Sequence, residues 1–210
     1  MNINDLILGS TSKFRAEILR QSGVASFRQM ASSADEEDVQ SLAPKELALA
    51  RSQLKAKGIL AEPTSVIITA DQVLEFEAKA YGKADNEEEA FARLRAFAGK
   101  KHMLHSCYTI SQGGGQKEPT ELISRVVTAS LEMRDLTDEQ IRAYLSTGEW
   151  RGCAGCYQFE NRGAHLFKEV QGDSFTIIGL PLPQLFLDLD NLGVDLLCNP
   201  KGPWELIPQA

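Results

Sequence analysis

Near its N-terminus the sequence reads Leu6-Ile7-Leu8-Gly9-Ser10-Thr11-Ser12-Lys13-Phe14-Arg15. The apolar residues are typical of a short buried strand, and the small and hydroxylic residues after them end it. A helix is expected over about 13–21, with Ser12 as its N-cap and Gly23 as its stop. A buried strand followed at once by a helix is a unit of α/β folds.

The rest of the chain alternates in the same way. The β-branched run Val66-Ile67-Ile68 predicts a second buried strand. Apolar residues occupy every other position from Val127 to Met133, which indicates a half-exposed, antiparallel strand. Helices are expected over 44–57, from Asp85 to about 99, over about 137–148 and after 183. We therefore expect one α/β (mixed α+β) domain over 1–210, with parallel and antiparallel strand pairs.

Two segments predict loops. The stretch 112–119 contains three consecutive glycines and is expected to form a mobile hairpin tip. The tail 199–210 contains three prolines and is expected to be extended.

The composition limits the function. A net charge of −7 argues against a nucleic-acid polymer as partner, although a local group of basic residues can still hold a small polyphosphate. No apolar run approaches the roughly 18 residues of a membrane span, and the first residues lack the pattern of a secretory signal. Four scattered cysteines fit reduced thiols, so we expect a cytoplasmic protein.

The junction at 8–15 is a candidate phosphate site. A helix N-terminus offers unpaired N–H groups and the positive end of its dipole, both of which favour a phosphate. Ser10 adds a hydroxyl group, and Arg15 can bind phosphate oxygens in a bidentate way. The alternative is that these residues only cap the helix.

Carboxylates supply the second candidate. Asp71 follows the strand predicted at 66–68, where it could hold Mg²⁺ or take a proton from water, or simply cap a turn. The acidic run 35–38 is either solvated or provides one carboxylate that shares this cation with Asp71. His102 and His105 receive no role, because residues three apart on a strand face away from each other. Cys153 and Cys156 are interpreted as buried small residues in a tight turn, with redox or metal use as the alternative.

Together these segments resemble the Maf family of nucleotide pyrophosphatases. The resemblance extends from residue 6 to about 190, with its parts in family order. It is carried by 6–12 with Arg15, Ala70-Asp71-Gln72, Gly82-Lys83, Cys153-Ala154-Gly155, Gly163, 169–172 and Gly179-Leu180-Pro181-Leu182-Pro183.

The resemblance implies a two-lobed Maf/ITPase-like fold, with a central mixed sheet and a nucleotide cleft, that is often a homodimer. It also implies a divalent metal cation, Mg²⁺ or Mn²⁺, and hydrolysis of a nucleoside triphosphate between its α- and β-phosphates. In the family pattern Asp71 is the base or metal ligand and Glu36 joins it at the metal. Ser10, Arg15 and Lys83 hold the triphosphate. The family's helix lysine falls at Gln53 or Lys55, depending on where a gap is placed.

Three further positions concern the base. Phe14, Gln72 and Glu160 resemble the subgroup associated with 7-methyl-GTP. A methylated guanine is cationic and stacks well on an aromatic ring, and a carboxylate accepts hydrogen bonds from the guanine edge. Phe14 could instead begin the apolar stripe of its helix.

Two alternative functions stay open. The same reaction could act on UTP, dTTP or modified pyrimidine nucleotides. Because the family is also linked to arrest of septum formation, the chain could instead be a nucleotide-binding regulator with little turnover.

Overall fold

The computed structural model describes residues 2–24, 26–35, 39 and 42–207. In chain order its elements are β1 (Asn2–Ile3), β2 (Asp5–Gly9), α1 (Lys13–Gln21), β3 (Arg28–Gln29), α2 (Pro44–Lys57), β4 (Ser65–Phe76), β5 (Lys79–Tyr81), α3 (Glu87–Phe97), β6 (Lys101–Gly114), β7 (Lys117–Met133), α4 (Asp138–Leu145), η2 (Arg162–Leu166), β8 (Phe167–Gln171), α5 (Ser174–Ile178), α6 (Leu182–Asn191) and β9 (Trp204–Glu205).

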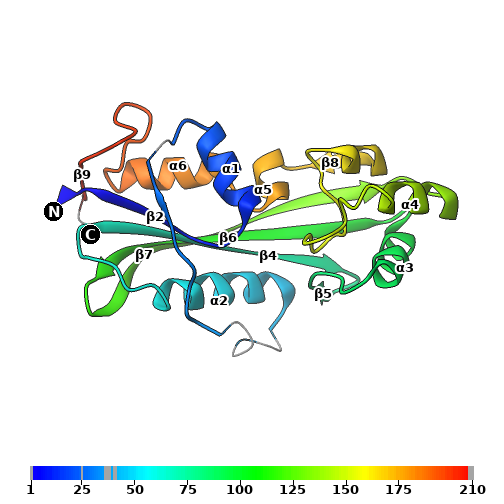
Figure 1. Cartoon of the computed structure of the whole chain (residues 1–210), viewed down its shortest axis with the longest axis horizontal. Helices are drawn as coiled ribbons and strands as arrows, with labels where there is room; N and C mark the ends of the chain where they lie inside the picture. Colours follow the sequence, from blue (N-terminus) through cyan, green and yellow to red (C-terminus); the bar gives the residue numbers. More distant parts are fainter. Residues whose placement is uncertain (1, 25, 36–38, 40–41, 208–210) are drawn as a thin grey trace.

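A mixed sheet runs through the whole molecule, in the strand order β3-β2-β4-β6-β7-β8 with β5 added beside β4. β2 pairs in parallel with β3 and β4, whereas the other pairs in this sheet are antiparallel. Figure 1 shows α2 on one side of the long strands and α1, α5 and α6 on the opposite side. The predicted mixed α/β class is confirmed.

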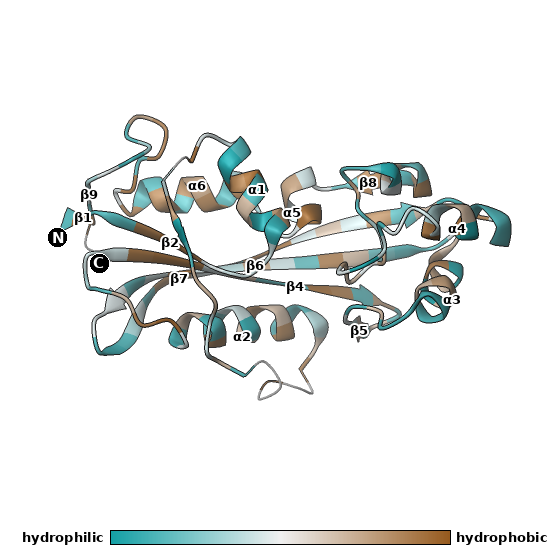
Figure 2. Ribbon diagram, viewed as in Figure 1, coloured by the Kyte–Doolittle hydropathy of each residue, from teal (hydrophilic) through white to brown (hydrophobic). Residues whose placement is uncertain are grey.

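Two apolar cores lie at opposite ends of the long strands. In Figure 2 the strands are brown near both ends and paler in the middle. The first core joins β2 and the start of β4 to α1 and α6, through residues that include Leu6, Leu8, Val66, Ile68, Leu185 and Leu189. The second joins the end of β4 to α3 and α4, through residues that include Leu74, Phe76, Leu94, Phe97, Ile141 and Tyr144. These two cores correspond to the expected lobes.

The helices follow their local sequence signals. Ser12 caps α1 by accepting a hydrogen bond from the Arg15 backbone N–H at 3.4 Å. Thr137 and Gln140 form the predicted capping box of α4. The predicted cap of α3 was wrong by one residue. Asn86, in an extended conformation, caps this helix through its side chain, whereas Asp85 lies before the cap.

The strands are longer than the apolar patterns predicted. β4 continues past the β-branched run as far as Phe76, because β6 pairs with it from Val66 to Glu75. The expected loop at 112–119 is mostly strand, and only Gly115 and Gln116 lie between β6 and β7. In the tail, Trp204 and Glu205 form β9 and pair with β1.

No helix in the described part of the chain is long and apolar enough to cross a bilayer.

Candidate functional site

A gap in one edge of the sheet exposes the middle of β4. β2 pairs with β4 from Ser65 to Thr69 and ends at Gly9, and β5 pairs with β4 only from Leu74 to Phe76. Among the described strands, residues 70–73 therefore have a neighbour only on the β6 side. A cavity of about 750 Å³, lined by Asp71 and Gln72 among others, lies at this gap. The sequence predicted that Asp71 follows its strand, but Asp71 lies in the middle of β4. It reaches the cavity because the neighbouring strand, β2, ends at Gly9.

Asp71 and Lys55 form an ion pair on the α2 side of β4. Lys55 Nζ lies 2.7 Å from Asp71 Oδ1, and their side chains are 12% and 10% exposed. The other carboxylate oxygen, Asp71 Oδ2, is buried and has no hydrogen-bond partner among the described residues. The structure therefore decides which residue of α2 reaches the site. Lys55 contacts Asp71, whereas Gln53 hydrogen bonds to Glu121 at 3.1 Å.

A second cation of α2, Arg51, also lines the cavity. Its Nε atom is buried and has no hydrogen-bond partner among the described residues. The sequence reasoning missed Arg51. Its signal was the spacing of four residues before Lys55, which places both cations on one face of a helix.

The opposite side of β4 is occupied by Gln72. Its Nε2 atom donates to Ser106 Oγ at 2.8 Å and approaches the carbonyl oxygens of Thr176 and Ile177 at 3.1 and 2.9 Å. Ser106 Oγ also donates to Thr176 O at 2.6 Å. Gln72 thus ties β4 to α5, and its amide nitrogen already has protein acceptors.

Arg15 closes the gap from the α1 side. Its Nε donates to Gly179 O at 2.8 Å, and its Nη1 donates to Ala70 O at 3.0 Å and to Ser10 Oγ at 3.2 Å. The bond to Ala70 satisfies a carbonyl oxygen of the gap segment. Arg15, which the sequence assigned to phosphate, therefore also holds α1, β4 and the turn after α5 together.

The loop between β2 and α1 has little room for larger residues. A Cβ atom at Gly9 would lie 2.2 Å from Ile59 Cδ1 and 2.6 Å from Thr69 Cγ2. Ser10 Oγ accepts from the Ser12 backbone N–H at 3.2 Å, and Ser10 O accepts from Gln29 Nε2 at 2.7 Å. Ser10 is thereby fixed at the cavity wall, where its hydroxyl group can also donate.

The loop 152–160 forms a third wall and adds Cys153, Tyr157, Phe159 and Glu160 to the cavity. Tyr157 is anchored from behind, because its hydroxyl group lies 2.8 Å from Nε2 of the buried His102. Phe159 packs against the second core and was missed by the sequence reasoning. The aromatic residues that alternate with polar ones just before Glu160 were its only signal.

The two cysteines of this loop lie in a tight turn, in which the Cys156 N–H donates to Cys153 O at 3.1 Å. Cys156 is buried and Cys153 is half-buried. Burial raises the pKa of Cys153 to about 12 and that of Cys156 to about 11, so both thiols stay protonated at neutral pH. This fits the interpretation of the pair as small residues in a turn.

The cavity brings together most of the predicted site residues: Ser10, Phe14, Arg15, Asp71, Gln72, Lys83 and Glu160 all line it. Phe14 is half-buried and belongs to none of the four apolar clusters of the described residues, so it does not begin a core stripe. Glu36, the second predicted metal ligand, lies outside the described residues. His102 and His105 do not share a site, because His105 hydrogen bonds to Glu75 and Thr128.

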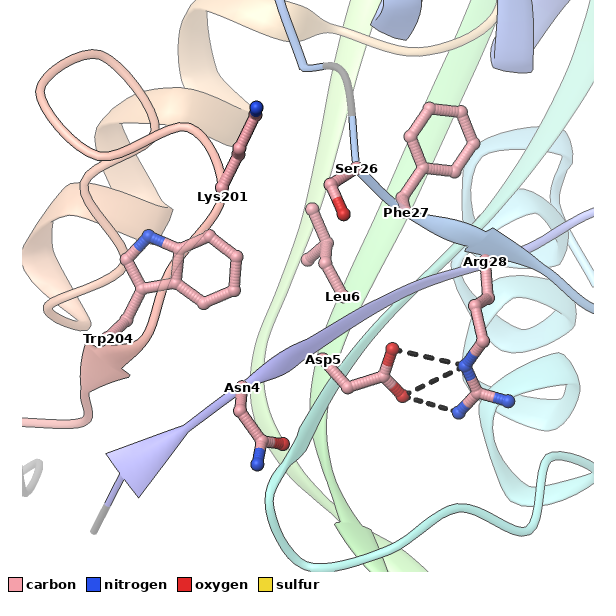
Figure 3. Close-up of a pocket in the computed structure, with 8 residues that line it drawn as sticks. All are labelled: Asn4, Asp5, Leu6, Ser26, Phe27, Arg28, Lys201 and Trp204. Carbon is pink, nitrogen blue, oxygen red and sulfur yellow. Dashed lines mark hydrogen bonds and ion pairs between the residues drawn. The ribbon is translucent and has the colours of Figure 1, made fainter.

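Figure 3 shows a smaller cavity, of about 220 Å³, near β1 and β9. It contains none of the predicted residues. Its carboxylate, Asp5, already pairs with Arg28, and this ion pair lowers the pKa of Asp5. On the opposite wall Trp204 donates its indole N–H to Asn199 O at 2.8 Å. The larger cavity is therefore the better candidate for chemistry.

Known proteins resemble this chain over nearly its whole length. A family model described as "Maf-like protein" matches residues 5–192. A 7-methyl-GTP pyrophosphatase of Bartonella henselae is 37% identical over 90% of this chain and 96% of that protein. A nucleoside triphosphate pyrophosphatase of Nitrobacter hamburgensis is 36% identical over 90% and 94% of the two chains. A dTTP/UTP pyrophosphatase of Dictyoglomus thermophilum is 32% identical over 92% and 98%. The sequence resemblance is confirmed: the chain belongs to the Maf family.

Proposed function

We propose that this Maf-family protein hydrolyses a nucleoside triphosphate between its α- and β-phosphates, releasing a monophosphate and pyrophosphate. The observation that carries the proposal is the Asp71–Lys55 pair at the sheet gap, in a cavity that basic side chains also line. The names of the relatives from Bartonella and Nitrobacter support the same reaction. We further propose that the preferred substrate is 7-methyl-GTP.

In this mechanism Asp71 is the general base. Lys55 binds Oδ1 and fixes the orientation of the carboxylate, which leaves Oδ2 without a protein partner among the described residues. Oδ2 can then accept the proton of the attacking water. Lys83 and Ser10 lie in the same cavity, where the ammonium group can neutralise the charge that builds on the phosphoryl oxygens and the hydroxyl group can donate a hydrogen bond to them.

The expected divalent cation fits the same carboxylate. An unpartnered, buried carboxylate oxygen is a suitable ligand for Mg²⁺ or Mn²⁺, which prefer oxygen donors and retain several waters, so Asp71 Oδ2 has this role as the alternative to taking the proton itself. The described residues contain no group of three side chains for a complete protein cage, so ligands beyond Asp71 and Glu36 would be waters and phosphate oxygens. Glu36 remains a proposed second ligand. A bound cation would withdraw charge from the phosphates and lower the pKa of a bound water.

Phe14 and Glu160 support the preference for a methylated guanine. Both line the cavity, where Phe14 offers a face for a cationic ring and Glu160 offers acceptors for the guanine edge. Gln72 was expected to contact the base. Since its amide nitrogen is bonded to Ser106 and α5, we propose that it acts on the base through the position of α5.

UTP or dTTP is the second candidate substrate, favoured by the name of the Dictyoglomus relative. Both candidates predict the same products, so product analysis tests the reaction and a substrate panel tests the base.

The experiment measures monophosphate, pyrophosphate and orthophosphate from 7-methyl-GTP, GTP, UTP and dTTP, with Mg²⁺, with Mn²⁺ and with a chelator. We expect pyrophosphate with each substrate that is hydrolysed, the highest kcat/KM for 7-methyl-GTP, and loss of turnover with the chelator. A diphosphate with orthophosphate would contradict the cleavage position. A higher kcat/KM for UTP or dTTP would contradict the base preference alone.

A further inference from the structure

We propose that Arg51 binds the pyrophosphate part of the substrate, at a subsite of the cavity next to the Asp71–Lys55 pair. The inference rests on the proposed function, because that function supplies the polyphosphate. It concerns a residue to which the sequence reasoning gave no role.

The helix geometry places Arg51 beside the reacting centre. Arg51 and Lys55 are four residues apart in α2, so they share a face and are separated by about 6 Å along the helix axis. Lys55 is held by Asp71 at 2.7 Å. Arg51 therefore lies one helical turn from the lysine that binds the Asp71 carboxylate, and both residues line the cavity.

The guanidinium group of Arg51 has a hydrogen-bond donor that an anion could satisfy. Its Nε atom is buried without an acceptor among the described residues, although buried N–H groups are nearly always hydrogen bonded. Arg15 differs, because its Nε and Nη1 atoms already donate to protein oxygens. A phosphate oxygen would satisfy the Nε atom of Arg51, and the planar guanidinium group favours bidentate contact with phosphate.

The two faces of β4 indicate which end of the nucleotide Arg51 binds. Successive side chains of a strand point to opposite faces, and Asp71 contacts α2 while Gln72 contacts α5. Arg51 is on the α2 side with Asp71. Phe14, the proposed base contact, belongs to α1 on the other side. A nucleotide whose base is near Phe14 and whose α-phosphate is near Asp71 would extend its β- and γ-phosphates toward Arg51.

The test measures binding of the two products, which needs no turnover. Inorganic pyrophosphate and 7-methyl-GMP are titrated calorimetrically, with Mg²⁺ present, into the wild type, Arg51→Gln, Arg51→Lys and the control Arg162→Gln. Arg162 is exposed and does not line the cavity. We expect Arg51→Gln to weaken pyrophosphate binding about tenfold or more and to change monophosphate binding by less than about twofold. Arg51→Lys should fall between the wild type and Arg51→Gln.

Unchanged pyrophosphate affinity, or equal losses for both products, would overturn the role of Arg51. If Arg51→Gln does not fold, as judged by circular dichroism, Arg51→Lys decides by the same comparison, because it keeps the charge and loses the bidentate geometry. Failure of the proposed function would look different. The wild type would then release other products, while the effect of Arg51 on pyrophosphate binding could still be measured.

Discussion

The two sides of β4 meet at one cavity, yet the polar groups on the two sides differ in whether they have hydrogen-bond partners within the protein. On the α5 side, Gln72 and Ser106 are hydrogen bonded to protein carbonyl oxygens, and Arg15 is bonded to Ala70 and Gly179. On the α2 side, Asp71 Oδ2 and Arg51 Nε are buried without partners among the described residues. The α5 side, whose polar groups are hydrogen bonded within the protein, is the saturated side and holds the elements together. The α2 side is the unsaturated side, where a ligand can form hydrogen bonds with buried groups.

Substitutions on the two sides should therefore affect different properties, stability on the α5 side and activity on the α2 side. Groups on the α5 side lose protein hydrogen bonds when they are replaced, so folding should suffer. Groups on the α2 side that lack protein partners should affect chiefly turnover and binding.

The largest expected effect concerns Asp71. We expect Asp71→Asn to lower kcat about a thousandfold, because an amide cannot accept the proton of the attacking water. Steady-state rates with 7-methyl-GTP test this, and Asp85→Asn, an exposed residue outside the cavity, is the matched control. A kcat within about tenfold of the wild type would show that Asp71 is not the base.

Arg15→Met should destabilise the protein, because it removes hydrogen bonds from the saturated side. Its loss leaves Ala70 O and Gly179 O without their Arg15 hydrogen bonds, so we expect the free energy of unfolding to fall by about 3 kcal/mol. Urea denaturation measures this change. Arg162→Met, a substitution of an exposed residue, serves as the control and should leave the urea midpoint unchanged. If Arg15→Met lost activity at full stability, Arg15 would act mainly on phosphate, and the contrast between the two sides would be weaker.

The smallest effect is expected at Glu160, which is exposed and belongs to the third wall. Glu160→Gln keeps the size of the side chain and removes the charge. We expect kcat/KM for 7-methyl-GTP to fall about tenfold while kcat/KM for UTP stays unchanged. Glu139→Gln, an exposed position on α4, is the control. Equal losses for both nucleotides would argue against a contact with guanine.

Local signals carried most of the fold prediction. The caps of α1 and α4 and the β-branched run of β4 depend on neighbours in sequence, and each prediction was confirmed. The length of β4 could not be predicted in this way. It depends on pairing with β6, whose residues lie more than 25 positions away.

The motifs that repeat the family pattern predicted residues that share the cavity, as at Asp71, Lys83 and Ser10. The choice between Gln53 and Lys55 needed the rotation of α2 relative to β4, which a sequence with an uncertain gap does not contain. Arg51 was missed because a basic residue on a helix is solvated by default. The bonds of Gln72 to α5 join residues more than 100 positions apart, and no local pattern indicates them.

The gap between β2 and β5 has a consequence for aggregation. An unpaired strand edge normally invites a strand from another molecule, and proteins protect such edges. Here the open segment 70–73 is short and is flanked by a strand at each end. Arg15 covers one of its carbonyl oxygens. The protein can therefore present backbone and side-chain groups to a small molecule while offering too little edge for intermolecular β-sheet growth.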